Sequence, residues 1–281
     1  MTKKFILITG CSSGIGRCCA IALKQRGWQV FASARKPQDV EMLTELGLAG
    51  VLLDLNDSIS IKNAVDSILK KTNGTLDALF NNAGYGQPGA VEDLSREALR
   101  ANFETNVFGA HELTRKIIPI MRRQGHGRII FNSSVLGLVA LPYRGAYNAS
   151  KFALEGLVDT MRLELSQGNI FASLIEPGPI KSLFRKNAQI MFHKNIDAKN
   201  SFYQKNYAGL EARLNKEGDA VPFTLPPEAV LAKLIHALEN PKPKARYYVT
   251  FPTYFLGILK RLISTSMLDK ILVLISSKEN K

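Results

Sequence analysis

The chain has 281 residues, of which 46% are hydrophobic, and a formal net charge of +13. This length and composition suit one substantial core, and no internal repeat, low-complexity tract or Pro/Gly/Ser linker calls for a second domain. The Lys and Arg residues are dispersed, with no basic-aromatic stripe and no nucleic-acid motif. We therefore expect a solvated basic surface and no nucleic-acid partner.

The N-terminal sequence bears on the cellular compartment of the protein. The Cys and His residues bear on whether it has disulfides or a metal site. Met-Thr-Lys-Lys leads directly into an apolar run, without the features of a signal peptide, so a cytoplasmic protein is expected. No Cys-x-x-Cys spacing occurs, which argues against a disulfide framework or zinc. The histidines are too scattered for a metal site, and none is given a catalytic role: His111, His126, His193 and His236.

Residues 5–9, Phe-Ile-Leu-Ile-Thr, form a short apolar run typical of a parallel strand covered on both faces. A glycine-rich segment follows, and residues 17–24 continue as a predicted helix. The unpaired N–H groups and the dipole at that helix start favour a diphosphate, although the spacing Gly-x-x-x-Gly-x-Gly is also compatible with a plain strand-to-helix turn. The candidate cofactor-binding residues are Gly10, Ser12, Ser13, Gly14, Ile15 and Gly16.

Cys11 lies inside this turn. A thiol at a helix N-terminus can have a lowered pKa, so Cys11 is the cysteine for which reactivity is expected, whereas Cys18 and Cys19 are expected to pack.

The next predicted strand, 29–34, ends at Arg35, where an NAD-selective protein would place a carboxylate for the ribose 2′-hydroxyl. No acid is present there. Arg35 instead suits a 2′-phosphate, to which Ser12, Ser13 or Arg17 could add donors, so the site favours NADP over NAD. The alternative is a solvated arginine at a strand end.

A third apolar run, 51–53, precedes Asp54 and Leu55. Asp54 suits the N-cap of the helix predicted over 58–72. A fourth strand, 78–80, leads into Asn82, Ala83 and Gly84, whose small size would let the backbone approach the cofactor; an Asn/Gly turn is the alternative.

Helices are also predicted over 96–123 and 146–167. In the second, Tyr147 and Lys151 are four residues apart and share one face, so the ammonium of Lys151 would lower the pKa of the Tyr147 phenol toward the working pH of a general acid/base. Ser134 precedes Tyr147 by thirteen residues. Together these residues predict a proton-transfer centre.

The alternation of strands and helices predicts an α/β protein: one Rossmann-type, doubly wound parallel sheet flanked by helices, over residues 1–250. The glycine turn, Asn82, Ser134 and Pro177 would converge at its carboxyl edge, where such sheets form a ligand crevice.

Several motifs occur in an order that resembles the short-chain dehydrogenase/reductase family, over about residues 4–182. Within the family the chain looks most like 17β-hydroxysteroid dehydrogenase-like and retinol dehydrogenase-like enzymes and bacterial NADP-dependent aldehyde reductases. The motifs are Thr-Gly-x-x-x-Gly-Ile-Gly at 9–16, Asn81-Asn82-Ala83-Gly84, Asn106, Ser134, Tyr147-x-x-x-Lys151 and Pro177-Gly178.

The resemblance implies that Tyr147 is the general acid for carbonyl reduction and the base for alcohol oxidation, and that Ser134 holds the substrate oxygen. It implies that Lys151 lowers the pKa of Tyr147 and binds the nicotinamide ribose, and that Asn106 holds a water linked to Lys151. It also implies a homodimer or homotetramer.

The resemblance places Pro177, Gly178 and Ile180 beside the nicotinamide, and for Asp54 it implies a contact with the adenine as the alternative to the N-cap. Ser182 stands where the family usually has threonine, which keeps the hydroxyl but leaves that contact less defined.

Residues 183–225 interrupt the alternation and predict a helical substrate lid, or a segment filled by its own side chains. Its apolar content implies an apolar substrate. Among its aromatic, Met and His residues are Phe184, Met191, Phe192, His193, Phe202, Tyr203 and Tyr207.

Residues 251–281 predict an amphipathic C-terminal extension that is too short and too interrupted by charge to span a bilayer. Three interpretations are open for 251–277: packing over the substrate mouth, a subunit interface, or contact with a membrane surface, which is the least favoured.

The sequence therefore predicts an NADPH-dependent reductase of hydrophobic aldehydes or ketones. One alternative is a 3-oxoacyl thioester reductase, which requires a basic patch for an acyl carrier protein. Arg122, Arg123 and Arg128 are the candidates for this patch, although a solvated helix end is the better interpretation of them. An alternative of another class is a redox sensor that binds NADP without turnover, against which the proton-transfer set argues.

Overall fold

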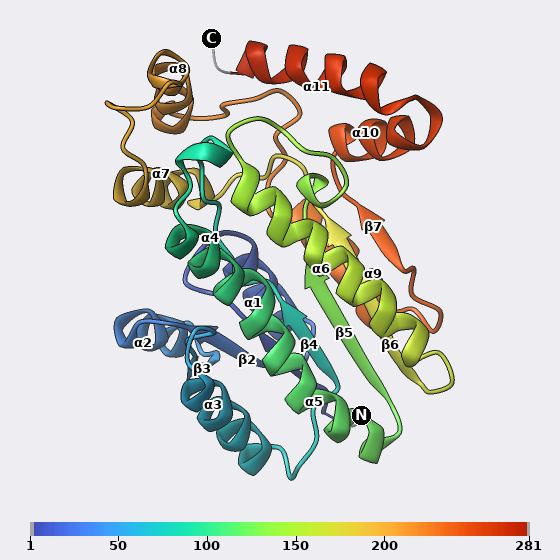
Figure 1. Cartoon of the computed structure of the whole chain (residues 1–281). Coiled ribbons are helices and arrows are strands. Elements are labelled where there is room, and N and C mark those ends of the chain that lie inside the picture. Colours follow the sequence, from blue (N-terminus) through green and yellow to red (C-terminus); the bar gives the residue numbers. More distant parts are fainter. Residues whose placement is uncertain (1–2, 280–281) are drawn as a thin grey trace.

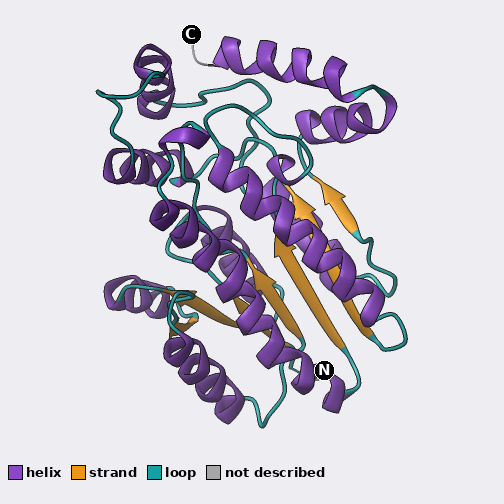
Figure 2. Cartoon of the chain, in the orientation of Figure 1, coloured by secondary structure: helices purple, strands orange, loops and turns teal. Residues whose placement is uncertain are grey.

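The computed structural model describes residues 3–279, which form one sheet with helices on both faces (Figures 1 and 2). Seven parallel strands in this part of the chain are ordered β3-β2-β1-β4-β5-β6-β7. The predicted doubly wound sheet is therefore confirmed. The strands are β1 Phe5–Ile8, β2 Gln29–Ala34, β3 Ala49–Leu52, β4 Ala78–Asn81, β5 Gly127–Asn132, β6 Ile170–Glu176 and β7 Arg246–Tyr248.

Each face of the sheet carries its own hydrophobic core, as expected for short apolar strands without polar alternation. Leu7, Leu79 and Ile129 point into the core beneath α3, α5 and α6, whereas Ile6, Ile8 and Phe80 point into the core beneath α1, α2 and α9. The helices of the two layers are α1 Gly14–Gln25, α2 Pro37–Glu45, α3 Ser58–Lys71, α5 Ala110–Gln124, α6 Gly145–Glu164 and α9 Glu228–Glu239.

The helix predicted over 96–123 is divided. α4 covers Arg96–Phe103, a π-helix covers Glu104–Gly109, and α5 continues from Ala110. A Cβ on Gly109 would lie 2.1 Å from the Leu55 carbonyl oxygen, so the π-helix passes very close to the chain that leaves β3. A π-helical turn is often found at functional sites, and Asn106 lies in this one.

Residues 183–225 contain two helices, α7 Phe184–Asn195 and α8 Gln204–Asn215, which share a small core with Ala90. Phe192, Tyr207 and Leu210 are buried in that core. The Tyr207 hydroxyl accepts a hydrogen bond of 2.9 Å from the backbone N–H of Ala90 and contacts Asp93. The predicted lid segment is thus largely filled by its own side chains and tied to the loop after β4.

The C-terminal residues form two further helices, α10 Phe251–Leu262 and α11 Thr265–Glu279. Leu256, Leu268 and Leu272 from these helices pack in one cluster with Tyr147. In Figure 1 α7, α8, α10 and α11 lie at the end of the molecule toward which the strands point. Among the described residues, no helix has the length and apolar content that crossing a membrane requires.

Candidate active site

The turn between β1 and α1 depends on glycine. Gly10 has a φ of +70°. A Cβ on Gly16 would lie 2.3 Å from the Gly10 carbonyl oxygen, so a larger residue cannot fit there. Ser13 precedes α1 in an extended conformation, and within residues 3–279 its side chain makes no capping hydrogen bond. The first N–H groups of α1 are thus available to an anion. Half-buried in the same turn are Ser12, Gly14 and Ile15.

Asn82 holds this turn in place. Its Nδ2 donates to the carbonyl oxygens of Thr9 at 2.8 Å and Gly10 at 3.2 Å, and its Oδ1 accepts from Asn132 Nδ2 at 2.9 Å. The Thr9 hydroxyl accepts from the backbone N–H groups of Asn82 and Ala83, both at 2.9 Å. The Asn82 side chain therefore joins strand ends, and Asn132 is a member of the site that sequence reasoning missed.

The ends of β2 and β3 border the same turn. Arg35 follows β2 directly and is exposed. Asp54 Oδ1 accepts a 2.9 Å hydrogen bond from the backbone N–H of Asn56, whereas the N-cap of α3 is Asp57, which accepts from the Ile59 N–H at 2.8 Å. The helix-cap interpretation of Asp54 is therefore wrong. Leu55 is buried in the core beside the π-helix.

Ser134 and Tyr147 form a buried pair of hydroxyl groups at the end of β5. Ser134 is 8% exposed and Tyr147 9%. Burial raises the pKa of the Tyr147 phenol to about 12, and a hydrogen bond with the Ser134 side chain opposes this rise. The expected lowering by Lys151 is not found: burial sets the direction of the shift, and the opposing effect comes from Ser134. At neutral pH Tyr147 carries its proton.

Lys151 lies one turn further along α6. Its Nζ donates a 2.7 Å hydrogen bond to the Asn132 carbonyl oxygen and is 5.6 Å from the centre of the Tyr147 ring. Burial lowers the pKa of this ammonium to about 8, and the charge of Glu155 partly offsets the shift. Lys151 is thus close to Tyr147, as the spacing predicts, but its nearest partner is the end of β5.

The side chain of Asn106 is engaged by protein atoms. Its Oδ1 accepts from the backbone N–H of Tyr85 at 3.0 Å, and its Nδ2 donates to the Tyr85 carbonyl and the Ser150 hydroxyl, both at 3.0 Å. A Cβ on Gly84 would lie 3.0 Å from Asn106 Oδ1 and 3.9 Å from Lys151 Nζ. Asn106, Gly84 and Lys151 therefore converge, and the Asn106 side chain fixes the loop after β4.

The segment after β6 closes the crevice. The Pro177 carbonyl accepts from the Val135 N–H at 2.8 Å. A Cβ on Gly178 would lie 2.1 Å from Thr250 Oγ1, which leaves room only for glycine. Ile180 pairs with Leu225 in an isolated bridge. Ser182 lies against the glycine turn, since a Cβ on Gly14 would be 2.9 Å from its Cβ.

Comparison with known proteins identifies the family to which a chain with this arrangement of site residues belongs. Residues 4–191 match the family described as short chain dehydrogenase. The chain belongs to the short-chain dehydrogenase family. It is therefore an oxidoreductase, and the resemblance seen in its motifs is confirmed.

The dehydrogenase is similar to known proteins over nearly its whole length. Uncharacterized oxidoreductase YbbO of Escherichia coli strain K12 is 43% identical over 270 residues, 96% of this chain and 94% of the relative. NADPH-dependent 3-dehydrocapnine reductase of Ornithobacterium rhinotracheale is 32% identical over 277 residues, 95% of each chain. A solved short chain dehydrogenase/reductase from Burkholderia phymatum, in complex with NAD, has a TM-score of 0.75 at 26% identity and 92% coverage of each chain.

A buried charged cluster lies behind the hydroxyl pair of the dehydrogenase. Arg246 contacts Glu155 and donates to Glu176 at 2.8 Å and to Asp159 at 2.5 Å. Glu155 also accepts a 2.5 Å hydrogen bond from the hydroxyl of Ser133, the neighbour of Ser134. One guanidinium therefore faces three carboxyl groups, an arrangement that favours protonation of at least one of them. Sequence reasoning missed this cluster.

Glu176 is the fully buried carboxyl group of this cluster. Burial and the nearby charge of Glu155 raise its pKa from 4.5 to about 8, against the effect of Arg246. Within the described residues its Oε2 is buried without a hydrogen-bond partner. Because the pKa is higher in the folded than in the unfolded chain, the group lowers the free energy of unfolding as the pH rises from 4.5 to about 8.

Replacement of Glu176 by Gln is expected to remove this titration while keeping the volume of the side chain. The free energy of unfolding of the variant should therefore decline less than that of the wild type between pH 5 and pH 8, as measured by urea denaturation. Glu239→Gln, which alters an exposed pair with Arg26, is the control and should leave the wild-type decline intact. An unchanged pH dependence in Glu176→Gln would contradict the assignment.

The structure bears on the predicted reactivity of Cys11 and on the search for a metal site. Cys11 is fully buried, its thiol donates to the Ile8 carbonyl at 3.2 Å, and burial raises its pKa to about 12. The predicted low pKa of Cys11 is therefore wrong, because the side chain points into the core and not toward the helix start. No group of metal-ligating side chains occurs in the described part of the dehydrogenase.

Proposed function

We propose that this dehydrogenase is an NADP(H)-dependent oxidoreductase that reduces apolar aldehydes or ketones to alcohols in a reversible reaction. The observation that carries the proposal is the buried hydrogen-bonded pair of Ser134 and protonated Tyr147 beside the glycine turn. Two hydroxyl donors placed in advance would stabilise the negative charge that develops on a carbonyl oxygen.

The residues around the turn fit a dinucleotide. The open N-terminus of α1 would hold the diphosphate, with Gly10 and Gly16 allowing close approach, and Arg35 with Arg17 would meet the 2′-phosphate. The name of the similar reductase from Ornithobacterium supports NADPH. Bound here, the nicotinamide would supply the hydride. The other proposed contacts are Asp54, Leu55, Asn82, Ala83, Gly84, Pro177, Gly178, Ile180 and Ser182.

Tyr147 would donate the proton to the substrate oxygen. Its raised pKa keeps the phenol protonated at neutral pH, which is the form that reduction requires. Ser134 would hold the same oxygen and Lys151 the nicotinamide ribose, within reach of Tyr147. The Asn106 side chain would act by fixing the loop that follows β4, since its polar atoms bond to Tyr85 and Ser150.

Apolar side chains surround the Tyr147 ring and support an apolar substrate. Leu136, Val139 and Leu141 pack with it from one side. From the lid, the Phe184 ring meets the Tyr147 ring edge-on, with 5.3 Å between their centres. A Cβ on Gly86 would lie 2.9 Å from Phe184 Cζ, so Phe184 fills the space between Tyr147 and the loop after β4.

Phe184→Ala is expected to widen the site next to the reacting oxygen. The ratio of kcat/KM for a branched ketone to that for a linear aldehyde should rise roughly tenfold, because one ring no longer limits the volume beside Tyr147. Kinetics with both substrates and NADPH would measure this. Phe202→Ala changes a far more exposed lid side chain, 88% accessible, and should leave the ratio unchanged. An unchanged ratio in Phe184→Ala would show that Phe184 does not limit the volume beside Tyr147.

The 3-oxoacyl thioester alternative loses support from the position of its basic residues. Arg122 and Arg123 lie in the last turn of α5, and Arg128 is the second residue of β5. Arg128 stacks on Phe171 at 4.3 Å and donates to the Asn240 carbonyl at 3.2 Å. These residues are at the amino ends of the strands, opposite Ser134.

The experiment that tests the proposal is oxidation of NADPH and NADH by the purified protein against long-chain and aromatic aldehydes, ketosteroids and an acetoacetyl thioester. We expect turnover with NADPH on the apolar aldehydes or ketones. Tight NADPH binding without turnover on any of them would favour the sensor alternative. Preferential turnover of the thioester would replace the proposed substrate class.

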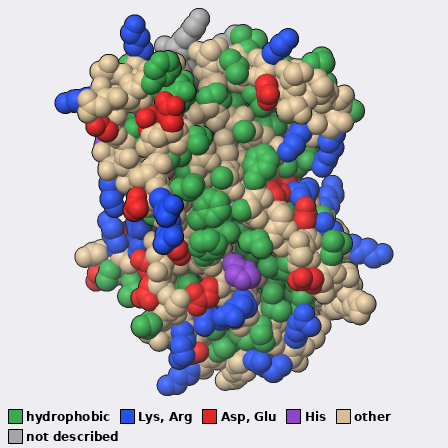
Figure 3. All heavy atoms as spheres, viewed as in Figure 1, with side chains coloured by type: hydrophobic (Ala, Val, Ile, Leu, Met, Phe, Trp, Pro, Cys, Tyr) green, Lys and Arg blue, Asp and Glu red, His purple; other side chains and the backbone are tan. Residues whose placement is uncertain are grey.

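We also propose a cytoplasmic homodimer or homotetramer. Hydrophobic side chains gather on the face formed by α4, α5 and α6 (Figure 3), which supports assembly through this face. The exposed apolar residues on these elements and the π-helix are Leu99, Phe108, Phe152, Leu157 and Leu163.

A further inference from the structure

Helix α10 is apolar on two opposite faces. Leu256 on its inner face packs in the cluster that contains Tyr147. The outer face carries a row of exposed apolar side chains at i, i+3, i+4, i+7 and i+11, which we call the outer stripe; their exposure ranges from 44% to 75%. The outer stripe consists of Phe251, Tyr254, Phe255, Ile258 and Leu262.

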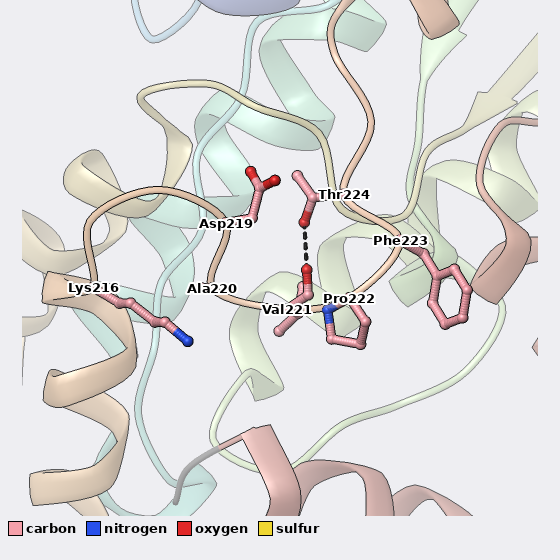
Figure 4. A pocket seen from close by; sticks show the side chains of 7 residues that line it. All are labelled: Lys216, Asp219, Ala220, Val221, Pro222, Phe223 and Thr224. Atoms are coloured by element: carbon pink, nitrogen blue, oxygen red, sulfur yellow. Dashed lines mark hydrogen bonds between the residues drawn. The ribbon is translucent and has the colours of Figure 1, made fainter.

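Phe223 extends the outer stripe from the lid. It belongs to the loop 216–224, which borders a hollow of about 310 Å³, and Figure 4 shows its ring pointing away from Lys216 and Asp219. The ring centre is 5.0 Å from that of Phe251, which stacks in turn on Phe255 at 5.9 Å. Phe223 has a φ of +61°, a strained value for a bulky residue, and is 57% exposed. A costly conformation that holds an aromatic ring outward points to a ligand surface.

Two cations on these helices are exposed near the outer stripe: Arg261 in the last turn of α10 and Lys270 in α11. Lys260 instead turns inward, where it contacts the Leu138 carbonyl and the Phe152 ring. Asp269 is the single acidic residue of segment 251–277, and the loop that carries Phe223 contains Glu217 and Asp219. An apolar stripe flanked by cations is the pattern of a helix that lies in the plane of an anionic membrane surface.

We propose that the outer stripe and Phe223 seat the protein on an anionic lipid bilayer. The apolar side chains would enter the boundary between headgroups and acyl chains, and Arg261 and Lys270 would meet lipid phosphates. Local charge favours this occupant over a second copy seated on the outer stripe, because that copy would bring its own Arg261 and Lys270 to the same contact.

The outer stripe and Phe223 are joined to the segment after β6 that borders the candidate site. The loop that carries Phe223 pairs with the segment after β6, through hydrogen bonds of 2.9 Å from Lys181 N–H to the Leu225 carbonyl and 3.1 Å from Leu225 N–H to the Pro179 carbonyl. We infer, resting on the proposed function, that the substrates are apolar carbonyl compounds dissolved in the bilayer. They would enter the site between this loop and α10.

Flotation with vesicles tests the surface without substrate or cofactor. The full-length protein should float with vesicles of equal phosphatidylcholine and phosphatidylglycerol, and less with phosphatidylcholine alone or in high salt. Phe255→Ser combined with Ile258→Ser should weaken partitioning about a hundredfold, at roughly tenfold for each apolar side chain. The matched control is Leu46→Ser combined with Ile59→Ser. These two apolar side chains are 44% and 70% accessible and lie after α2 and in α3, away from the outer stripe.

Three outcomes would overturn the inference: no flotation of the wild type, equal loss in the control pair, or a stripe-dependent change of oligomeric mass without flotation, which would assign the stripe to a second copy. The variant with Phe255→Ser and Ile258→Ser should turn over a short, water-soluble aldehyde with NADPH at the wild-type rate. Failure of flotation with turnover retained removes this inference alone. Flotation without turnover on any carbonyl removes the proposed function and leaves the lipid surface standing.

Discussion

Tyr147→Phe is expected to lower kcat for carbonyl reduction by roughly a hundredfold to ten-thousandfold, the range attributed to a positioned general acid. The variant keeps the ring that packs against Phe184 and loses only the hydroxyl that pairs with Ser134. NADPH binding should therefore persist at wild-type affinity. Stopped-flow turnover and fluorescence titration of NADPH would measure the two quantities separately.

Tyr248→Phe serves as the control for Tyr147→Phe. Tyr248 lies at the end of β7, where its ring meets that of Tyr254 at 5.4 Å, so its hydroxyl is outside the proton-transfer set. It should retain wild-type turnover. Retained activity in Tyr147→Phe would show that the proton comes from another group. Loss of NADPH binding together with turnover would show a structural defect.

Arg35→Asp is expected to weaken NADPH binding roughly a hundredfold, because a charge-assisted contact to the 2′-phosphate is lost and a repulsive carboxylate replaces it. NADH carries a hydroxyl at that position, so its affinity should change little or improve. Titration of both cofactors would give the ratio of the two dissociation constants.

The control for Arg35→Asp is Lys70→Asp. It makes the same charge change on an exposed residue in the last turn of α3. It should affect NADPH only slightly, through the overall potential. If Arg35→Asp weakened NADPH and NADH equally, the 2′-phosphate assignment would be lost and NAD would become the better candidate.

Local patterns were sufficient to predict the sheet and most of the site. Short apolar strands, the glycine turn and the Tyr147–Lys151 spacing each depend on neighbouring residues, so their structure follows from the sequence nearby. The π-helix at Asn106 could not be read in this way, because the local pattern is that of an unbroken helix. Its path depends on a close approach to Leu55, which is distant in sequence.

The pKa values could not be predicted from spacing because they depend on burial in the folded chain. Tyr147 and Cys11 were both expected to have lowered pKa values on account of a neighbouring cation or helix start. In each case removal from water has the larger effect and raises the pKa to about 12. The cluster of Glu155, Glu176 and Arg246 was missed for a related reason, since its members come from separate elements.

The position of Arg246 near the end of the chain has a consequence for biosynthesis. Glu155 and Glu176 precede their shared guanidinium by 91 and 70 residues. While the ribosome is still adding those residues, closing the sheet would bury both carboxyl groups without their cation. The nascent chain should therefore complete its catalytic half only after β7 has emerged, so that folding of this half is delayed until translation is almost finished.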